Sequence, residues 1–141
     1  MQIKKQLLKD TTVLFIIANV EKETEIKYRE FNIISRKRQY VFARQLAMYF
    51  MNKYTKLSLD DIGIIFDRDH STVIHAKKTI INLKYSDKFI AAMCKNISER
   101  IEKRLSRFNK SKLHVFESLL DIYVEDPTEI KHWFTEFLNA K

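Results

Sequence analysis

The sequence predicts an all-α fold in which a helix-turn-helix lies within a helical bundle. The 141-residue chain contains one Gly and one Pro, whereas strand-rich folds need turn residues at every hairpin. Apolar side chains recur at helical spacing along most of the chain, and hydrophobic residues make up 45% of it, enough for a core. We therefore expect a helical domain over residues 1–105, followed by an extra helical segment over residues 106–141.

The first part of the chain predicts three helices. One begins near Asp10 or Thr11, either of which can cap a helix, and a shorter helix follows it before Asn32. A basic loop at residues 36–38 then precedes a longer helix over residues 39–54. At helical spacing this longer helix carries four residues that we expect to be buried, namely Phe42, Leu46, Tyr49 and Phe50.

Residues 58–84 predict two helices joined by a tight turn. Ser58 is placed to cap the first helix and is followed by acidic residues in the first helical turn, where they suit the positive end of the helix dipole. The turn lies at Asp67 and Arg68, and Asp69 is placed to cap the second helix. This arrangement is typical of a helix-turn-helix.

The remaining residues predict three more helices, over residues 87–105, over residues 113–124 and from Asp126 onward. At the last start, Asp126, Pro127 and Glu129 occupy the cap, first and third positions that helix termini favour. This helix carries an apolar stripe of Ile130, Trp133, Phe134, Phe137 and Leu138. The stripe either packs on the domain's own core or forms a surface for a second copy or a replication protein.

Positive charge is concentrated in the first three-quarters of the chain. Residues 1–105 contain 21 Lys and Arg against 12 Asp and Glu, whereas residues 106–141 contain 5 against 6. A basic domain favours a polyanionic partner, although charge alone suits RNA, DNA or an anionic membrane surface. The near-neutral tail indicates that residues 106–141 do not lie on the polyanion.

Two features indicate a protein of the reducing cytoplasm. The apolar run from Val13 to Val20 is short and is followed directly by charges, so we interpret it as a buried helix rather than an export signal or membrane span. Cys94 is the only cysteine, which excludes an internal disulfide and a Cys-based zinc site. We expect its side chain to be buried.

The second helix of the pair has two faces with different chemistry. Its core-facing stripe consists of Val73, Ala76, Ile80 and Leu83. A second face carries hydrogen-bonding or cationic groups and no carboxylate, namely Ser71, His75, Lys78 and Asn82. Any surface helix has a polar face, but the preceding short helix, the tight turn and the basic context favour a helix that reads the DNA major groove.

The residues that begin this helix resemble a known family. The string RDHSTVIHA at residues 68–76 closely resembles the C-terminal DNA-binding domain of DnaA, the bacterial chromosomal replication initiator. The string RKRQYVFARQLAMYF at residues 36–50 is similar to that family's basic loop and following helix. LSLDDIG at residues 57–63 looks like its first helix-turn-helix element, so the resemblance covers roughly residues 10–104. It implies a DnaA domain IV-like, Trp-repressor-like bundle.

The resemblance also implies a role for individual residues on double-stranded DNA. The residues expected in or near the major groove are Arg68, Asp69, His70, Ser71, Thr72 and His75. The residues expected at the minor groove, where arginine is favoured in narrow A·T-rich stretches, are Arg36 with Lys37 and Arg38. The residues expected to contact phosphates, which fix the register, are Arg44, Gln45 and, from the polar face of the second helix, Lys78.

Three positions depart from the family's pattern. Members commonly have two small residues between the equivalents of Phe66 and Arg68, whereas this chain has only Asp67. Asp60 stands where many members have Pro, and Asn52 replaces a commonly basic residue. These changes bear on the docking angle and on the target sequence.

Nothing in the sequence indicates an enzyme, a cofactor or a metal. A nucleotide-binding phosphate loop needs a Gly-rich turn ending in Gly-Lys-Ser/Thr, but the only glycine is Gly63, within the helix pair. The four histidines are scattered, and His70 and His75 lie on different faces of one helix. We expect no nucleotide and no membrane among the partners.

The predicted function is sequence-specific binding of duplex DNA at DnaA-box-like sites, for replication-origin binding or regulation without ATPase activity. Two alternatives remain. One is a transcriptional regulator that binds DNA through the same helix-turn-helix, and the other is a protein-interaction module that captures a replication factor. The predicted architecture is a DNA-binding domain without an ATPase module. Such an architecture suits a phage or other mobile element.

Overall fold

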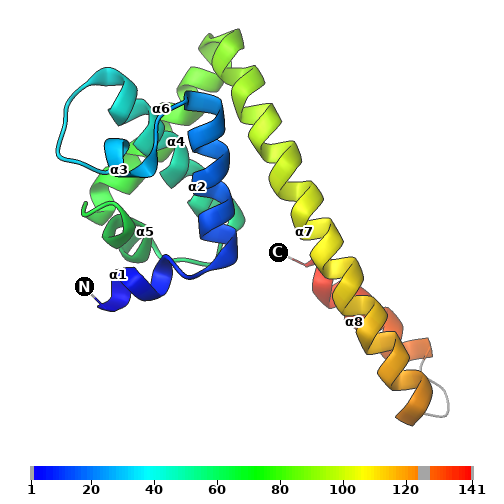
Figure 1. Ribbon diagram of the computed structural model, residues 1–141. Helices are drawn as coiled ribbons and strands as arrows, with labels where there is room; N and C mark the ends of the chain where they lie inside the picture. Colours follow the sequence, from blue (N-terminus) through cyan, green and yellow to red (C-terminus); the bar gives the residue numbers. More distant parts are fainter. Residues whose placement is uncertain (1, 124–127, 141) are drawn as a thin grey trace. The chain divides into compact units, whose positions relative to one another are not determined.

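The computed structural model describes residues 2–123 and 128–140, which form eight helices and no strands (Figure 1). The all-α prediction is therefore confirmed. Contacts within the chain divide it into two compact units, residues 1–101 and residues 102–141. The first unit contains the predicted helix-turn-helix.

The first unit begins with three helices, α1 (Gln2–Leu7), α2 (Thr11–Thr24) and α3 (Tyr28–Phe31). The sequence analysis did not predict α1. Asp10 caps α2, because its carboxylate accepts the backbone N–H groups of Thr12 at 2.8 Å and of Val13 at 3.2 Å. Of the two expected caps, Asp10 is therefore the one used.

Helix α4 (Arg38–Tyr54) lies at the centre of this unit and packs against α2, α3, α5 (Leu59–Ile65) and α6 (His70–Ser86). The predicted bounds of α4 and of the helix pair differ from these by a few residues at most. Of the side chains expected to be buried in α4, only Phe42 is half-buried. The side chains that fill the core between the helices are fully buried, among them Ile16, Phe31, Leu46, Phe50, Ile62, Phe66, Val73 and Ile80.

Helix α7 (Lys88–Tyr123) corrects one prediction. The sequence predicted separate helices over residues 87–105 and 113–124, but a single helix of 36 residues spans both. Residues 106–112 are mostly polar and contain neither Gly nor Pro, so nothing in them ends a helix. In the first unit, α7 buries Met93, Cys94, Ile97 and Ile101. Burial raises the pKa of the Cys94 thiol, as suits the inert core residue that was predicted.

The second unit combines the end of α7 with α8 (Thr128–Asn139). The Phe116 and Phe134 ring centroids lie 3.9 Å apart, and the Asn109 amide donates to the Leu138 carbonyl at 3.3 Å. Trp133 and Phe137 stack on each other but are 61% and 60% exposed. The apolar stripe of α8 is therefore only partly covered, and the predicted start signal at residues 126–127 lies outside the described residues.

Candidate nucleic-acid interface

Asp69 organises the first turn of α6. Its carboxylate accepts the Thr72 backbone N–H at 3.0 Å, the Thr72 hydroxyl at 3.3 Å and the Ser71 hydroxyl. These hydrogen bonds, that of the Ser71 side chain foremost, hold the pKa of Asp69 below its usual range. The predicted cap is confirmed, and the carboxylate remains ionised at neutral pH at the exposed start of the helix.

The exposed face of α6 has the polar composition that the sequence predicted. Ser71, His75, Lys78 and Asn82 are all exposed, and the stripe on the opposite side is buried except for half-buried Leu83. Thr72 is half-buried, and His70 is exposed with its Nδ1 3.5 Å from the Asp60 carboxylate of α5. A continuous surface of hydrogen-bonding groups therefore begins at the N-terminus of α6.

Gly63 is what lets α5 and α6 meet in so short a turn. Its carbonyl accepts the backbone N–H groups of Phe66 at 3.1 Å and of Arg68 at 2.8 Å. A Cβ atom at residue 63 would lie 2.3 Å from the Arg68 carbonyl oxygen, well inside van der Waals contact. Asp67 completes the turn with a φ of 54°, a left-handed conformation that Asp tolerates better than most residues. The sequence analysis used Gly63 only to exclude a phosphate loop and missed this role.

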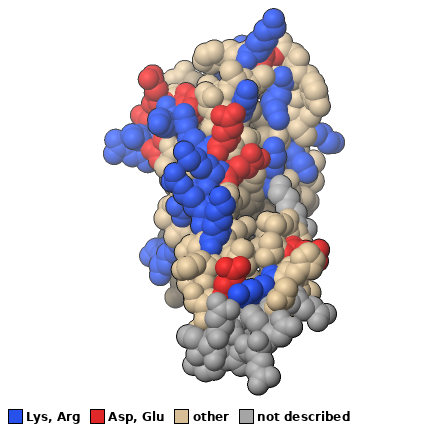
Figure 2. Space-filling view, turned by 90° about the vertical axis from the view of Figure 1, so that its right-hand side faces the viewer, with Lys and Arg blue, Asp and Glu red and all other residues tan. Residues whose placement is uncertain are grey.

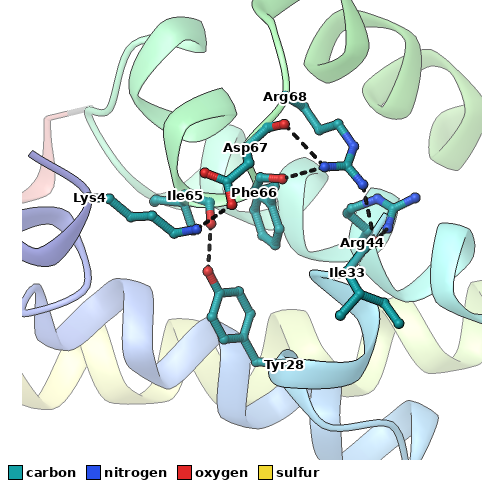
Figure 3. Close-up of polar contacts among 8 residues, drawn as sticks. All are labelled: Lys4, Tyr28, Ile33, Arg44, Ile65, Phe66, Asp67 and Arg68. Atoms are coloured by element: carbon teal, nitrogen blue, oxygen red, sulfur yellow. Dashed lines mark hydrogen bonds and ion pairs between the residues drawn. The ribbon is translucent and has the colours of Figure 1, made fainter. Parts of the chain in front are cut away.

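Arg68 connects the helix-turn-helix to the basic loop (Figure 3). Its guanidinium donates to the carbonyls of Phe66 at 2.8 Å and Asp67 at 3.1 Å within the turn. It also donates to the Ile33 carbonyl at 3.2 Å, in the segment that leads to the basic loop before α4. The predicted contact of Arg68 with the major groove stays a prediction, because the structure shows the half-buried side chain bonded to the protein backbone.

Arg44, a residue of α4, holds the segment of residues 31–35 that leads to the basic loop. The side chain is only 7% exposed, and its guanidinium donates to the carbonyls of Phe31 at 2.7 Å, Ile33 at 3.1 Å and Ser35 at 3.2 Å. Burial lowers the pKa of Arg44, and the charge of Arg68 lowers it further. The structure shows a buried support for the loop where the resemblance implied a phosphate contact, and that contact stays a prediction.

The outer side of this loop is basic and accessible. Arg36 and Lys37 in the loop and Arg38, which the structure makes the first residue of α4, are all exposed, and the Lys37 ammonium lies 5.6 Å from the centre of the Tyr40 ring. A surface hollow separates the loop from the turn and is lined by Ile34, Ser35, Arg36, Arg44, Asp67 and Arg68. Gln45, the other residue expected to contact a phosphate on α4, is half-buried.

Two further contacts hold the turn on the side of α1 and α3 (Figure 3). The Tyr28 hydroxyl donates to the Ile65 carbonyl at 2.5 Å, and burial, aided by the charge of Asp67, raises the pKa of Tyr28 to about 12. The Lys4 ammonium lies 2.6 Å from the Asp67 carboxylate. The sequence analysis predicted neither contact, because the partners are 37 and 63 residues apart in the chain.

The surface displays the excess of positive charge that the composition gives the chain. On the face drawn in Figure 2, Lys and Arg side chains gather in a dense group, with Asp and Glu side chains beside them. Among the described residues, no three His, Cys, Asp or Glu side chains are grouped closely enough to hold a metal ion. None of the described helices combines the length and the apolar character that a bilayer crossing requires.

Comparison with known proteins points to one family. The family model described as "Bacterial dnaA protein helix-turn-helix" matches residues 13–80, which include the basic loop and the start of α6. The chromosomal replication initiator protein DnaA of Flavobacterium psychrophilum is 39% identical over 71% of this chain and 24% of its own length. The same protein of Thermoanaerobacter pseudethanolicus is 34% identical over 72% of this chain and 23% of its length. That of Thermus thermophilus is 36% identical over 61% of this chain and 20% of its length. The chain thus spans less than a quarter of the length of these relatives.

Proposed function

Because residues 13–80 of this chain belong to the bacterial DnaA helix-turn-helix family, we propose that the protein binds duplex DNA sequence-specifically at DnaA-box-like sites. The observation that carries this proposal is the connection between the two DNA-facing elements. The guanidiniums of Arg44 and Arg68 both donate to the Ile33 carbonyl, so the basic loop is held at a set position relative to the start of α6. Two grooves of one duplex are read together only if the two elements keep that spacing.

The start of α6 supplies the base contacts in this proposal. Residues at the N-terminus of a recognition helix reach base edges in the major groove, where their hydrogen-bonding groups distinguish the four base pairs. His70, Ser71 and His75 are exposed there, with Thr72 next to them. The Asp69 carboxylate repels phosphates but accepts a hydrogen bond from a cytosine amino group. It therefore favours a cytosine at the base pair that it faces.

The basic loop supplies the minor-groove contact. Arg36 enters the narrow groove next to the site, where the negative potential is strongest over A·T-rich steps. Lys37 and Arg38 add positive charge beside it, and Gln45 and Lys78 contact phosphates. In this arrangement Arg44 and Arg68 act first as supports, because their guanidiniums already bond to backbone carbonyls.

The proposed role of this helix-turn-helix is to occupy replication-origin sites. Transcriptional regulation at similar sites requires the same DNA contacts and differs only in the location of those sites. A second class of function, the capture of a replication factor, is favoured by one observation. Trp133 and Phe137 remain largely exposed on α8, and exposed aromatic side chains mark protein interfaces.

Binding assays on single-site variants test the assigned roles. His70→Ala and Ser71→Ala should each weaken specific binding by ~1–3 kcal/mol for every base edge that the side chain reads, with an unchanged salt dependence. Lys37→Ala should weaken binding to all sequences and flatten the logarithmic salt slope by ~0.9 for each phosphate that the lysine neutralises. Ser86→Ala is the matched control, since Ser86 is an exposed serine at the far end of the same helix.

Selection from random duplexes with the purified protein then tests the proposal as a whole. We expect an enriched site with a conserved core and an adjoining A·T-rich stretch. If the protein shows no preference among duplexes that differ only in base order, sequence-specific reading is wrong. Capture of a replication factor by such a protein would then favour the interaction module.

A further inference from the structure

Ile34 lies between α3 and α4 and is 96% exposed, the largest value for any bulky apolar side chain among the described residues. A single exposed apolar side chain needs no explanation by itself, but here the backbone on both sides of it is fixed. The Ile33 carbonyl accepts hydrogen bonds from Arg44 at 3.1 Å and from Arg68 at 3.2 Å (Figure 3). The Ser35 carbonyl accepts another from Arg44 at 3.2 Å. These bonds hold the segment in a conformation that leaves Ile34 in water.

Ile34 also lines the hollow between the basic loop and the turn. The other residues that line this hollow are Ser35, Arg36, Arg44, Asp67 and Arg68. In the described part of the chain, none of these three arginines forms an ion pair with a carboxylate, and the Asp67 carboxylate lies 2.6 Å from the Lys4 ammonium. Excess positive charge attracts a polyanion. The partner that covers Ile34 is therefore anionic.

The spacing of Ile34 and Arg36 determines which part of a duplex Ile34 reaches. The Ser35 hydroxyl accepts the Lys37 backbone N–H at 3.2 Å, which fixes the chain around Arg36. Two residues of chain span at most ~7 Å, about two base-pair steps of ~3.4 Å. With Arg36 in the minor groove, Ile34 lies in the same groove within about two base pairs of it.

The minor groove offers an apolar side chain one chemical distinction. Both kinds of base pair display hydrogen-bond acceptors there, but only G·C adds a donor, the guanine amino group. Adenine has a C–H group at the same place. An isoleucine packed against guanine would deprive that donor of water without supplying an acceptor, and an unsatisfied donor is costly. Against adenine the same side chain meets the C–H group.

We propose that Ile34 enters the minor groove beside Arg36 and excludes G·C pairs there, because its side chain cannot accept a hydrogen bond from the guanine amino group. This inference rests on the proposed function, in which the basic loop meets the minor groove. It adds a second selection to that of Arg36. Arginine favours a narrow groove with a strong negative potential, whereas Ile34 discriminates against one exocyclic group.

Modified bases test this selection without altering the major groove. Diaminopurine in place of adenine adds the amino group, and inosine in place of guanine removes it. At one or two pairs of the A·T-rich stretch that adjoins the selected core, diaminopurine should weaken binding of the wild-type protein about 5-fold or more. A G·C pair at the same place should weaken binding similarly, and inosine·C should restore the affinity.

Substitutions separate Ile34 from Arg36, since the amino group also affects the groove into which the arginine fits. Ile34→Ser should remove most of the diaminopurine penalty because a hydroxyl accepts from the amino group, whereas Ile34→Val should keep the penalty. Ile33→Ser is the matched control, because Ile33 is 51% exposed but does not line the hollow, and it should also keep the penalty. Circular dichroism checks that each variant is folded.

The possible failures are distinguishable. If Ile34→Ser keeps the full penalty and Arg36→Ala loses it, the arginine alone senses the amino group and the inference is wrong. A wild-type protein that binds its selected site but tolerates diaminopurine throughout the A·T-rich stretch would overturn the inference and leave the proposed function intact. If selection yields no site, the proposed function fails and the inference fails with it.

Discussion

Replacing Gly63 by Ala should destabilise the helix-turn-helix although alanine is the better helix former. The new Cβ would lie 2.3 Å from the Arg68 carbonyl oxygen, and the nearest carbons of Arg68 and Asp69 would be 3.3 Å away. All three atoms belong to the backbone, so no side chain can rotate away to relieve the overlap. The turn between α5 and α6 must open instead.

Three effects determine the size of the destabilisation. Overpacking in a close-fitting site costs about 1–3 kcal/mol. Opening the turn weakens the hydrogen bond from the Arg68 N–H to the Gly63 carbonyl, now 2.8 Å long, which contributes about 0.5–1.5 kcal/mol. The higher helix propensity of alanine returns about 1 kcal/mol. The expected net decrease in the free energy of unfolding is therefore roughly 0.5–3.5 kcal/mol.

Urea denaturation, monitored by circular dichroism, measures this decrease. Binding to a selected DNA site measures how the substitution affects DNA binding by the helix-turn-helix. Asn96→Ala is a suitable control, because Asn96 is exposed within α7 of the same unit and gains helix propensity without crowding. Its stability should be unchanged or slightly increased. If Gly63→Ala proves as stable as the wild-type protein, the close approach at the turn has no energetic weight and the reasoning is refuted.

Two further substitutions test the supports of the turn and the loop. Tyr28→Phe removes the hydrogen bond to the Ile65 carbonyl and should lower stability at pH 7 by about 0.5–1.5 kcal/mol. Because the pKa of Tyr28 is raised to about 12, its contribution is complete below the ordinary tyrosine pKa of about 10 and is lost as the pH rises through 12. The variant should therefore lose less stability than the wild type between pH 9 and pH 11.5, and equal losses in urea titrations would contradict this. Arg44→Met leaves the buried Phe31 carbonyl without its side-chain donor and should lower stability by about 1–3 kcal/mol, while the Ile33 carbonyl keeps its bond from Arg68. The salt slope of DNA binding should stay unchanged, and a slope flattened by ~0.9 with stability intact would instead support the phosphate contact.

Features that depend on interactions between residues close together in the chain were predictable from the sequence. The caps at Asp10, Ser58 and Asp69 were predictable because each side chain bonds to backbone N–H groups two or three residues ahead. The two faces of α6 were predictable because helical periodicity alone assigns them. The predicted break in α7 was wrong. Residues 106–112 are mostly polar and contain neither Gly nor Pro, and such residues form an exposed helix as readily as a loop.

The role of Arg44 shows why the site was only partly predictable. An arginine beside a basic loop resembles a phosphate contact in any linear pattern, and only the packing of α3 against α4 shows three carbonyls around its guanidinium. The same holds for Tyr28 and Lys4, whose partners in the turn are far away along the chain. Sequence spacing carries no information about such partners.

The sequence by itself determined the all-α class, the helix pair, the residues that begin its second helix and the family that they resemble. It could do so because capping, periodicity and turn chemistry act within a few residues of the chain. Only the tertiary structure decided that Gly63 lets the two helices meet and that Arg44 and Arg68 tie the loop to the turn. Those features arise where separate helices pack together, and packing depends on the whole fold.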